Sequence, residues 1–257
     1  MQTQTDPSVT EDQARETEAA VAAALSALFV YEYTQGALTV AAWYSEVQSR
    51  VGDELRALAG TVLSATLRSL FGRSWSGLIP GWGLVATSVV DRTTWSLARA
   101  ARKVANAAAP SPVSEYTPTK LAISAVTETV ARAQTEPFRN TTVVETPTGL
   151  QVVRQGAVAP SNAETMQVVK TWRTKRDKRV RPTHGGLEGD LIPVDGSWTT
   201  FEGHRLRFPG DPLAPLSETA NCRCRQSIAV VSVADTLQRS GAEYDSALAA
   251  RKRERVA

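Results

Sequence analysis

Apolar residues recur at helical spacing through most of the N-terminal half of the chain. One run steps by four, four, four and three positions, through Trp43, Val47, Val51, Leu55 and Leu58. This spacing places the side chains on one face of a helix, and such a face needs a partner to bury it. Similar stripes precede and follow this run. We therefore expect a disordered start over residues 1–13 and a helical domain with a bundle core over residues 14–135.

The composition allows a sizeable core and argues against several classes of protein. Of the 257 residues, 42% are hydrophobic, and the formal charge of +3 is mildly basic. The two cysteines are too few for the disulfide framework of a small secreted protein. The N-terminal segment is polar and acidic, unlike a signal peptide, and the apolar runs are too short or too broken to span a bilayer. We expect a soluble protein with no standard secretion signal and no membrane contact.

From about residue 140 the pattern becomes that of short strands and loops. "TTVVETPTGLQVVRQG" predicts two strands around a Pro-Thr-Gly turn, and "ETMQVVKTWRT" alternates as a strand does. Before them, Thr117 and Pro118 mark a helix start, and that helix should reach about Gln134. The fold class is therefore α+β: a helical N-terminal half, then a small loop-rich domain with a short antiparallel sheet over residues 136–232. Residues 233–257 should form a C-terminal helix and a basic tail.

A run of basic residues begins at the end of the last predicted strand and is opposed only by Asp177. Together with two arginines beside the cysteines, it suggests contact with a phosphate backbone, because each neutralised phosphate releases counterions. No helix-turn-helix spacing or RNA-binding aromatic signature accompanies the charges, so such contact would be independent of nucleic-acid sequence. The alternative is a solvated strand end and turn. The candidate DNA-binding residues are Lys170, Arg173, Lys175, Arg176, Lys178, Arg179, Arg181, Arg223 and Arg225.

Both cysteines, Cys222 and Cys224, lie in the same region as both histidines, His184 and His204. Two thiolates and two imidazoles suffice for a tetrahedral zinc site, and Asp177 is the substitute if His204 points away. The single residue between the cysteines matches no standard zinc finger, and it disfavours a disulfide between them. The plainer alternative is that both are alternate residues of a short strand and pack as small hydrophobes. On that alternative, which we favour from the sequence alone, no cofactor is expected.

The segment over about residues 165–230 carries an ordered set of short motifs. "TWRTKRDKRVRPTHGGLEGD" is followed by "FPGDP" and then by "NCRCR". This combination resembles the C-terminal domain of the phage Mu F-like minor head proteins, also called the phage head morphogenesis family. His204 does not belong to the pattern, and the two predicted strands within residues 141–156 stand where the resemblance implies a helix. The positions that match in order are Trp172, Thr174, Asp177, Arg179, Val180, Arg181, His184, Leu187, Gly189, Pro209, Gly210, Asp211, Asn221, Cys222, Arg223 and Cys224.

The resemblance implies a minor capsid protein of a tailed phage or prophage. Such a protein would be present in few copies inside the phage head near the portal, after assembly in the host cytoplasm. Its implied partners are the portal protein, the major capsid or scaffold proteins and packaged double-stranded DNA. Its role would be in capsid assembly or in DNA packaging or ejection.

The sequence shows no complete catalytic constellation, and we expect no enzyme, although proteins of the family that it resembles sometimes accompany head proteases or are fused to them. Two catalytic alternatives use His184: a head maturation protease, and a nuclease or toxin in which the neighbouring arginines hold a phosphodiester. The sequence contains no nucleophile elbow of the Gly-x-Ser-x-Gly type. Scaffold roles for the matched residues, such as a turn capped by Asn221, are the preferred interpretation.

Overall fold

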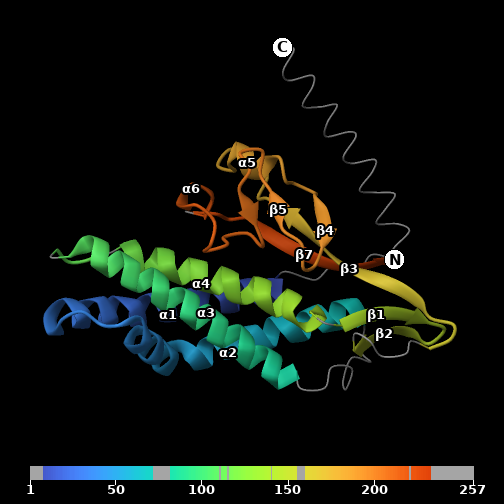
Figure 1. Ribbon diagram of the computed structural model, residues 1–257, viewed down its shortest axis with the longest axis horizontal. Helices are drawn as coiled ribbons and strands as arrows, with labels where there is room; N and C mark the ends of the chain where they lie inside the picture. The colour runs from blue at the N-terminus through green and yellow to red at the C-terminus, as the bar shows by residue number, and fades with distance from the viewer. Residues whose placement is uncertain are drawn as a thin grey trace, which may run out of the picture.

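The computed structural model describes residues 8–71, 82–109, 111–114, 116–139, 141–154, 160–219 and 221–232. Long helices form one layer, and a small sheet with its loops lies against them (Figure 1). The protein is thus α+β, with the helices first, as the sequence predicts. The expected start of the helical domain is corrected, because the first helix already begins at Ser8. The expected C-terminal helix and tail, over residues 233–257, lie outside the described residues.

Four helices form the bundle, and the predicted apolar stripe faces its core. Trp43 and Leu55 are fully buried and pack against side chains from the other three helices. The helix predicted to start at Thr117 begins one residue earlier and ends one residue later than expected. None of the described helices is long and apolar enough to cross a membrane. The bundle helices are α1 (Ser8–Gln35), α2 (Val40–Phe71), α3 (Trp82–Ala108) and α4 (Tyr116–Thr135).

One buried carboxylate, that of Glu32, links three parts of the bundle. It accepts a hydrogen bond of 3.1 Å from the indole Nε1 of Trp43 and pairs at 3.1 Å with Arg102. It also accepts the backbone N–H of Leu38 at 2.9 Å, in the turn after α1. A buried charge is tolerated when it is paired and hydrogen-bonded in this way. The contacts therefore fix α1, α2 and α3 relative to one another.

The main sheet is antiparallel and built around its longest strand, β3. β1 and β4 pair with different parts of one edge of β3, β7 pairs along the other edge, and β2 extends the sheet beyond β1. The predicted turn between the first two strands is present, and Gly149 ends it with φ +113°, a backbone angle that favours glycine. The five strands are β1 (Thr141–Thr146), β2 (Gly149–Arg154), β3 (Glu164–Arg173), β4 (Leu191–Pro193) and β7 (Arg225–Ser232).

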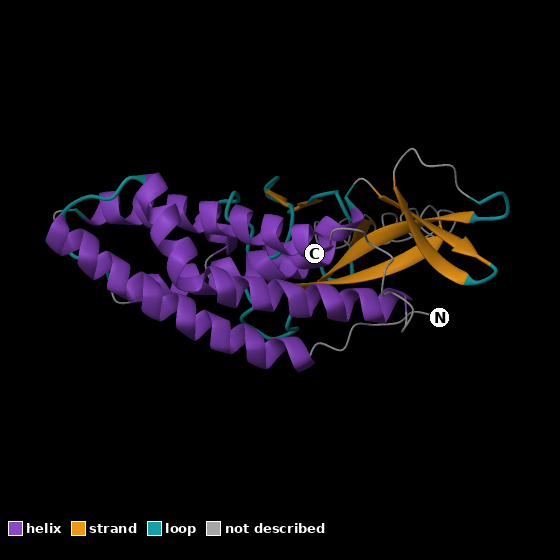
Figure 2. Ribbon diagram, turned by 90° about the horizontal axis from the view of Figure 1, so that it is seen from below, coloured by secondary structure: helices purple, strands orange, loops and turns teal. Residues whose placement is uncertain are grey.

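The remaining elements are short and belong to the loops of the small domain. η2 follows α4 directly and leads into β1. The other short elements gather over α4, away from the β1–β2 hairpin, which lies at one end of the bundle (Figures 1 and 2). β5 and β6 pair as a separate two-stranded sheet. These elements are η2 (Glu136–Phe138), α5 (Pro182–Gly185), β5 (Trp198–Thr199), β6 (Arg205–Leu206) and α6 (Leu216–Thr219).

The small domain is attached to the bundle by both apolar and polar contacts. Buried residues near the end of α2, such as Leu67, share a core cluster with Val168 of β3 and Ile228 of β7. The side-chain amide of Gln226 donates to the backbone carbonyl of Ala131 in α4 at 3.1 Å. The strands β3 and β7 of the small domain are therefore held directly against the helical half.

Candidate functional site

Two loops bring His184 and the cysteines together. Pro182, whose fixed φ suits the first turn of a helix, opens the single turn of α5 that carries His184. Cys222 and Cys224 come just before β7 and alternate with the exposed Arg223, so both sulfurs lie on the buried side. The expected alternation of the two cysteines is present, although they precede the strand β7 and do not lie on it.

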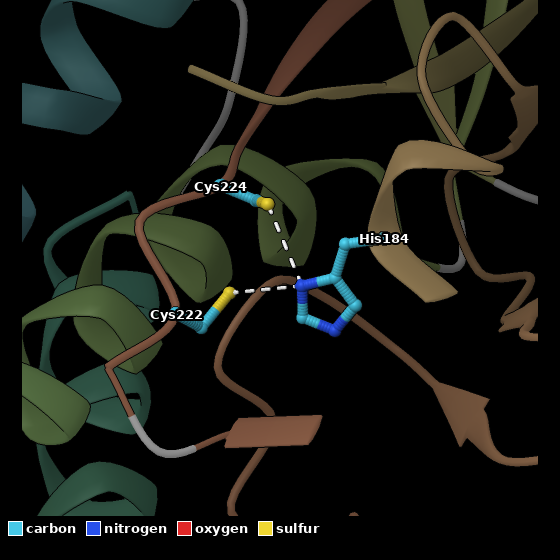
Figure 3. Close-up of side chains that lie close together, drawn as sticks. All are labelled: His184, Cys222 and Cys224. Carbon is cyan, nitrogen blue, oxygen red and sulfur yellow. Dashed lines mark hydrogen bonds between the residues drawn. The ribbon is translucent and has the colours of Figure 1, made fainter. Parts of the chain in front are cut away.

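The imidazole of His184 contacts both thiols through a single atom. Its Nδ1 lies 3.6 Å from Sγ of Cys222 and 3.5 Å from Sγ of Cys224 (Figure 3). His184 is 1% exposed, and the two cysteines are 8% and 6% exposed. The ring of Trp172 meets the imidazole edge to face at 5.2 Å between centroids. The sequence prediction that these three residues meet is confirmed.

The two thiols have opposite proton affinities. A hydrogen bond from Cys224, supported by His184, lowers the pKa of Cys222 to about 4. The hydrogen bond to Cys222, together with burial, raises the pKa of Cys224 above its ordinary value. A lowered thiol pKa favours the thiolate, which is the form that binds metal. Of the two cysteines, Cys222 therefore loses its proton more readily.

Glu218 of α6 holds the far side of the imidazole and links both histidines. One carboxylate oxygen lies 3.0 Å from Nε2 of His184, although not in the direction of a hydrogen bond, and the other lies 2.9 Å from Nδ1 of His204. The hydroxyl of Thr183 donates to the same carboxylate at 2.9 Å. Burial opposes ionisation of Glu218, but its hydrogen bonds from His204 and Thr183 outweigh burial and lower its pKa.

The two residues expected to complete a metal site do not join the cysteines. Asp177 accepts a hydrogen bond of 2.7 Å from Arg223 on the exposed side of the loop. His204 lies on the other side of Glu218, where it forms a separate acidic group with Glu202 and Glu218. Among the described residues, the group of potential ligands that includes both thiols is His184, Cys222 and Cys224. The expectation that Asp177 or His204 supplies a fourth ligand is therefore corrected.

The basic segment divides into residues that face inward and residues that reach solvent. Lys170 is 3% exposed, donates to the carbonyl of Arg207 at 2.6 Å and lies 4.9 Å from the ring centre of Trp198. It cannot contact DNA in this conformation, so its assignment as a DNA-binding residue is wrong. Burial lowers the pKa of Lys170 to about 8.

Of the remaining predicted DNA contacts, several have acceptors within the protein. Arg176 pairs with Glu188 at 2.9 Å, and Arg223 pairs with Asp177. Arg181 donates to the backbone carbonyl of Glu218, and Arg173 donates to the hydroxyl of Ser227. Arg225 is exposed at the start of β7. Lys175, Lys178 and Arg179 are exposed on the loop after β3 and present its outward charge.

Three positions of the matched pattern adopt left-handed backbone angles. Gly189 has φ +85°, Gly210 has φ +73° and Asn221 has φ +56°. Glycine and asparagine tolerate this region better than other residues do. The neighbouring Asp211 is almost fully buried and forms a two-point ion pair with Arg207. These matched residues therefore serve turns and packing, in agreement with the scaffold roles preferred from the sequence.

Sequence reasoning missed Glu218. Its carboxylate is 1% exposed and contacts both histidines, yet no metal-site spacing or catalytic motif includes it. The available signal was its place four positions before Cys222, as an acidic residue in an otherwise uncharged stretch.

Comparison of the chain with models of protein families, with characterised proteins and with solved structures finds no match. The functional assignment therefore depends on the motif pattern and on the geometry of the small domain.

Proposed function

We propose that this chain is a minor capsid protein of a tailed phage or prophage, located inside the head near the portal. The observation that carries the proposal is the clustering of the matched motifs. Trp172, His184, Cys222 and Cys224 are spread over more than fifty positions, yet they share one buried cluster. A pattern whose members meet in space is better explained as one structural unit than as a chance set of short matches.

The burial of His184 favours a structural role over catalysis. Its Nδ1 faces two thiols, its Nε2 faces Glu218, and its side chain is 2% exposed. A general base or nucleophile activator must reach the proton that it moves. A polymer substrate has no direct approach to this ring, which argues against the protease and nuclease alternatives.

The helical half offers a surface for protein partners. Val30, Tyr31 and Tyr33 near the end of α1 are 63%, 48% and 59% exposed, and Trp95 of α3 is 43% exposed. Exposed aromatic and aliphatic side chains are enriched where proteins associate. In the proposed role this half contacts the portal or the capsid, while the basic loop of the small domain contacts packaged DNA without sequence preference.

The proposal is tested by locating the chain in particles. Phage particles from the strain that carries this gene are purified, and their proteins are quantified by mass spectrometry against the major capsid protein. We expect this chain in a few copies per particle, and gold-labelled antibodies on opened heads should mark the portal vertex. Purified particles that lack the chain, or that carry it in hundreds of copies over the whole shell, would overturn the proposal.

A further inference from the structure

We propose that His184, Cys222 and Cys224 bind one zinc ion, through Nδ1 and the two sulfurs. In tetrahedral zinc sites, Zn–S bonds of about 2.3 Å and Zn–N bonds of about 2.0–2.1 Å place the nitrogen and a sulfur about 3.5 Å apart. The separations here are 3.6 and 3.5 Å. Both N–S separations thus match edges of such a tetrahedron, the three ligand atoms lie within 4.8 Å of one another, and both sulfurs point toward the nitrogen (Figure 3).

The partner of the other imidazole nitrogen supports the same assignment. The negative carboxylate of Glu218 lies 3.0 Å from Nε2, and its charge favours a proton on that nitrogen although the contact is not aligned as a hydrogen bond. A proton on Nε2 leaves the lone pair of Nδ1 for a metal. A carboxylate behind a histidine ligand is a recurrent arrangement in zinc proteins, where it orients the ring and increases its basicity. His204 and Thr183 hold Glu218 in turn. The histidine is thus positioned as a ligand rather than as a freely rotating side chain.

Without a cation, the cluster leaves hydrogen-bonding capacity unused. The single lone pair of Nδ1 faces two sulfurs, and it can accept well from only one thiol. The buried indole Nε1 of Trp172 also lacks a hydrogen-bond partner of ordinary geometry, and it lies close enough to Cys224 to interact with its sulfur. A zinc-bound thiolate would accept from that N–H. One cation would therefore use both sulfurs and the lone pair of Nδ1 at the same time.

The chemistry of the ligands selects the metal. Two thiolates and one imidazole favour zinc over magnesium or calcium, which prefer oxygen ligands. Cys222 and Cys224 also line a cavity of about 440 Å³ between the bundle and this segment, which gives water room beside the site. We assign the fourth position to a water molecule. The ion would join α5 to the segment before β7.

The test starts with the full-length protein expressed in zinc-supplemented medium and purified without chelator under reducing conditions. Elemental analysis should give about one zinc per chain, and X-ray absorption should give two sulfur and two nitrogen or oxygen neighbours. Replacing zinc with Co²⁺ should produce sulfur-to-cobalt charge-transfer absorption. Metal-free protein with reduced thiols, which binds no zinc when titrated by calorimetry, would overturn the proposal.

Substitutions distinguish the residues that bind zinc from the residues that lie beside the site. Cys222→Ser and Cys224→Ser should each lose the metal, whereas His204→Asn, which changes the chain's other histidine, should retain one zinc per chain. Glu218→Gln should weaken zinc affinity by roughly 10–100-fold without abolishing binding. If a cysteine variant does not fold, the wild-type protein is treated instead with a mercurial reagent that modifies its thiols. The reagent should then release one zinc per chain. Equal zinc in wild-type protein and in both serine variants would refute the assignment. The proposal is independent of the capsid role, because its readouts need only the isolated chain.

Discussion

The two halves of this protein are held together by different means. In the helical half, stripes of apolar residues pack into a continuous core, and the buried charge of Glu32 is paired and hydrogen-bonded. In the small domain, strands are few, and the interior contains His184, Lys170, Asp211 and Glu218, all nearly inaccessible to solvent. The first half depends on repeated small gains in apolar burial, whereas the second depends on a few specific polar contacts.

This difference determines how each half should respond to substitution. When a methylene group is removed from the bundle, many neighbouring side chains each lose a small contact, so the loss of stability should follow the volume removed. When one hydrogen-bonding partner is removed from the small domain, another buried polar group is left without a hydrogen bond. The loss of stability then depends on which polar atom is left unpaired. Substitutions of similar size in the two halves should therefore differ in their local consequences more than in their total cost.

The largest effects are expected from large buried side chains. Trp172→Ala removes a fully buried ring that packs against His184 and Trp198, so the free energy of unfolding should fall by about 3–5 kcal/mol. Leu55→Ala in the bundle should cost about 2–5 kcal/mol. Urea denaturation measures both losses.

The reactivity of the thiols distinguishes the two substitutions. In Trp172→Ala, Cys222 and Cys224 should react with a thiol reagent faster than the unfolded fraction explains, because their cover is removed locally. In Leu55→Ala the reaction rate should follow the unfolded fraction. If thiol reactivity followed the unfolded fraction in both variants, the two halves would unfold as one unit. The proposed difference between the halves would then be wrong.

An intermediate effect is expected from the buried amine of Lys170. Its pKa is about 8 in the folded protein, below the ordinary value near 10.5, mainly because burial disfavours the charged amine. Asp195 and Asp211 raise the pKa, but Arg207 and Arg139 lower it, so the effect of burial remains the largest. The full penalty applies below pH 8 and disappears as the pH rises toward 10.5, where the unfolded chain also loses its proton. Stability should therefore rise with pH across this interval.

Lys170→Met tests this assignment. The substitution removes the buried charge but also the hydrogen bond to the carbonyl of Arg207, so the expected net gain is about 1–2 kcal/mol at pH 7. The contribution of this residue to the pH dependence should vanish. Urea denaturation of both proteins at pH 7 and pH 9.5 makes the comparison. An unchanged pH dependence in the variant would show that another group is responsible.

The same contrast explains what could be read from the sequence. The stripe through Trp43 and Leu55 predicts the bundle because helix packing has a period that one chain displays by itself. The alternation about Arg223 likewise predicts which side the cysteines face. The partners of Lys170 and Glu218 could not be predicted, because they come from loops whose paths follow no period. Charge alone suggested that Lys170 meets DNA, whereas its position in the central strand buries it.

A smaller effect is expected where the two halves meet at Gly210. With φ +73°, any larger residue is strained there, and a new Cβ would lie 3.2 Å from Cγ2 of Thr127 in α4. Gly210→Ala should therefore cost about 1–3 kcal/mol. Gly189→Ala is the matched control, since Gly189 has φ +85° but no atom within 4 Å of its added Cβ. It should show the backbone cost of about 1–2 kcal/mol alone.

A second change isolates the contact with α4. Thr127→Ser removes the crowded methyl group, so it should recover part of the loss in Gly210→Ala and none of the loss in Gly189→Ala. The double-mutant comparison in urea measures this coupling. If Thr127→Ser affected both glycine variants equally, the turn at Gly210 would not press on α4. The two halves would then be held together by the apolar cluster and the Gln226 hydrogen bond without this contact.

The smallest effect on stability, and the most specific one on binding, is expected from the exposed loop. Lys175, Lys178 and Arg179 face solvent, so changing all three to Gln should leave the free energy of unfolding within about 0.5 kcal/mol per site. If these side chains contact phosphates, affinity for duplex DNA should fall about equally for unrelated sequences. The slope of log affinity against log salt should flatten by about 2–3, because fewer counterions are released on binding.

The helical half supplies the control for charge. Arg99, Lys103 and Lys120 are also exposed, and changing them to Gln removes the same formal charge from the bundle. If DNA binding belongs to the small domain, this second triple variant should keep the wild-type salt slope, because a general loss of charge does not remove a phosphate contact. Filter binding or fluorescence anisotropy over a range of salt concentrations measures both variants. Equal weakening in the two variants would assign the interaction to overall charge, and the functional contrast between the halves would then have no basis in DNA contact.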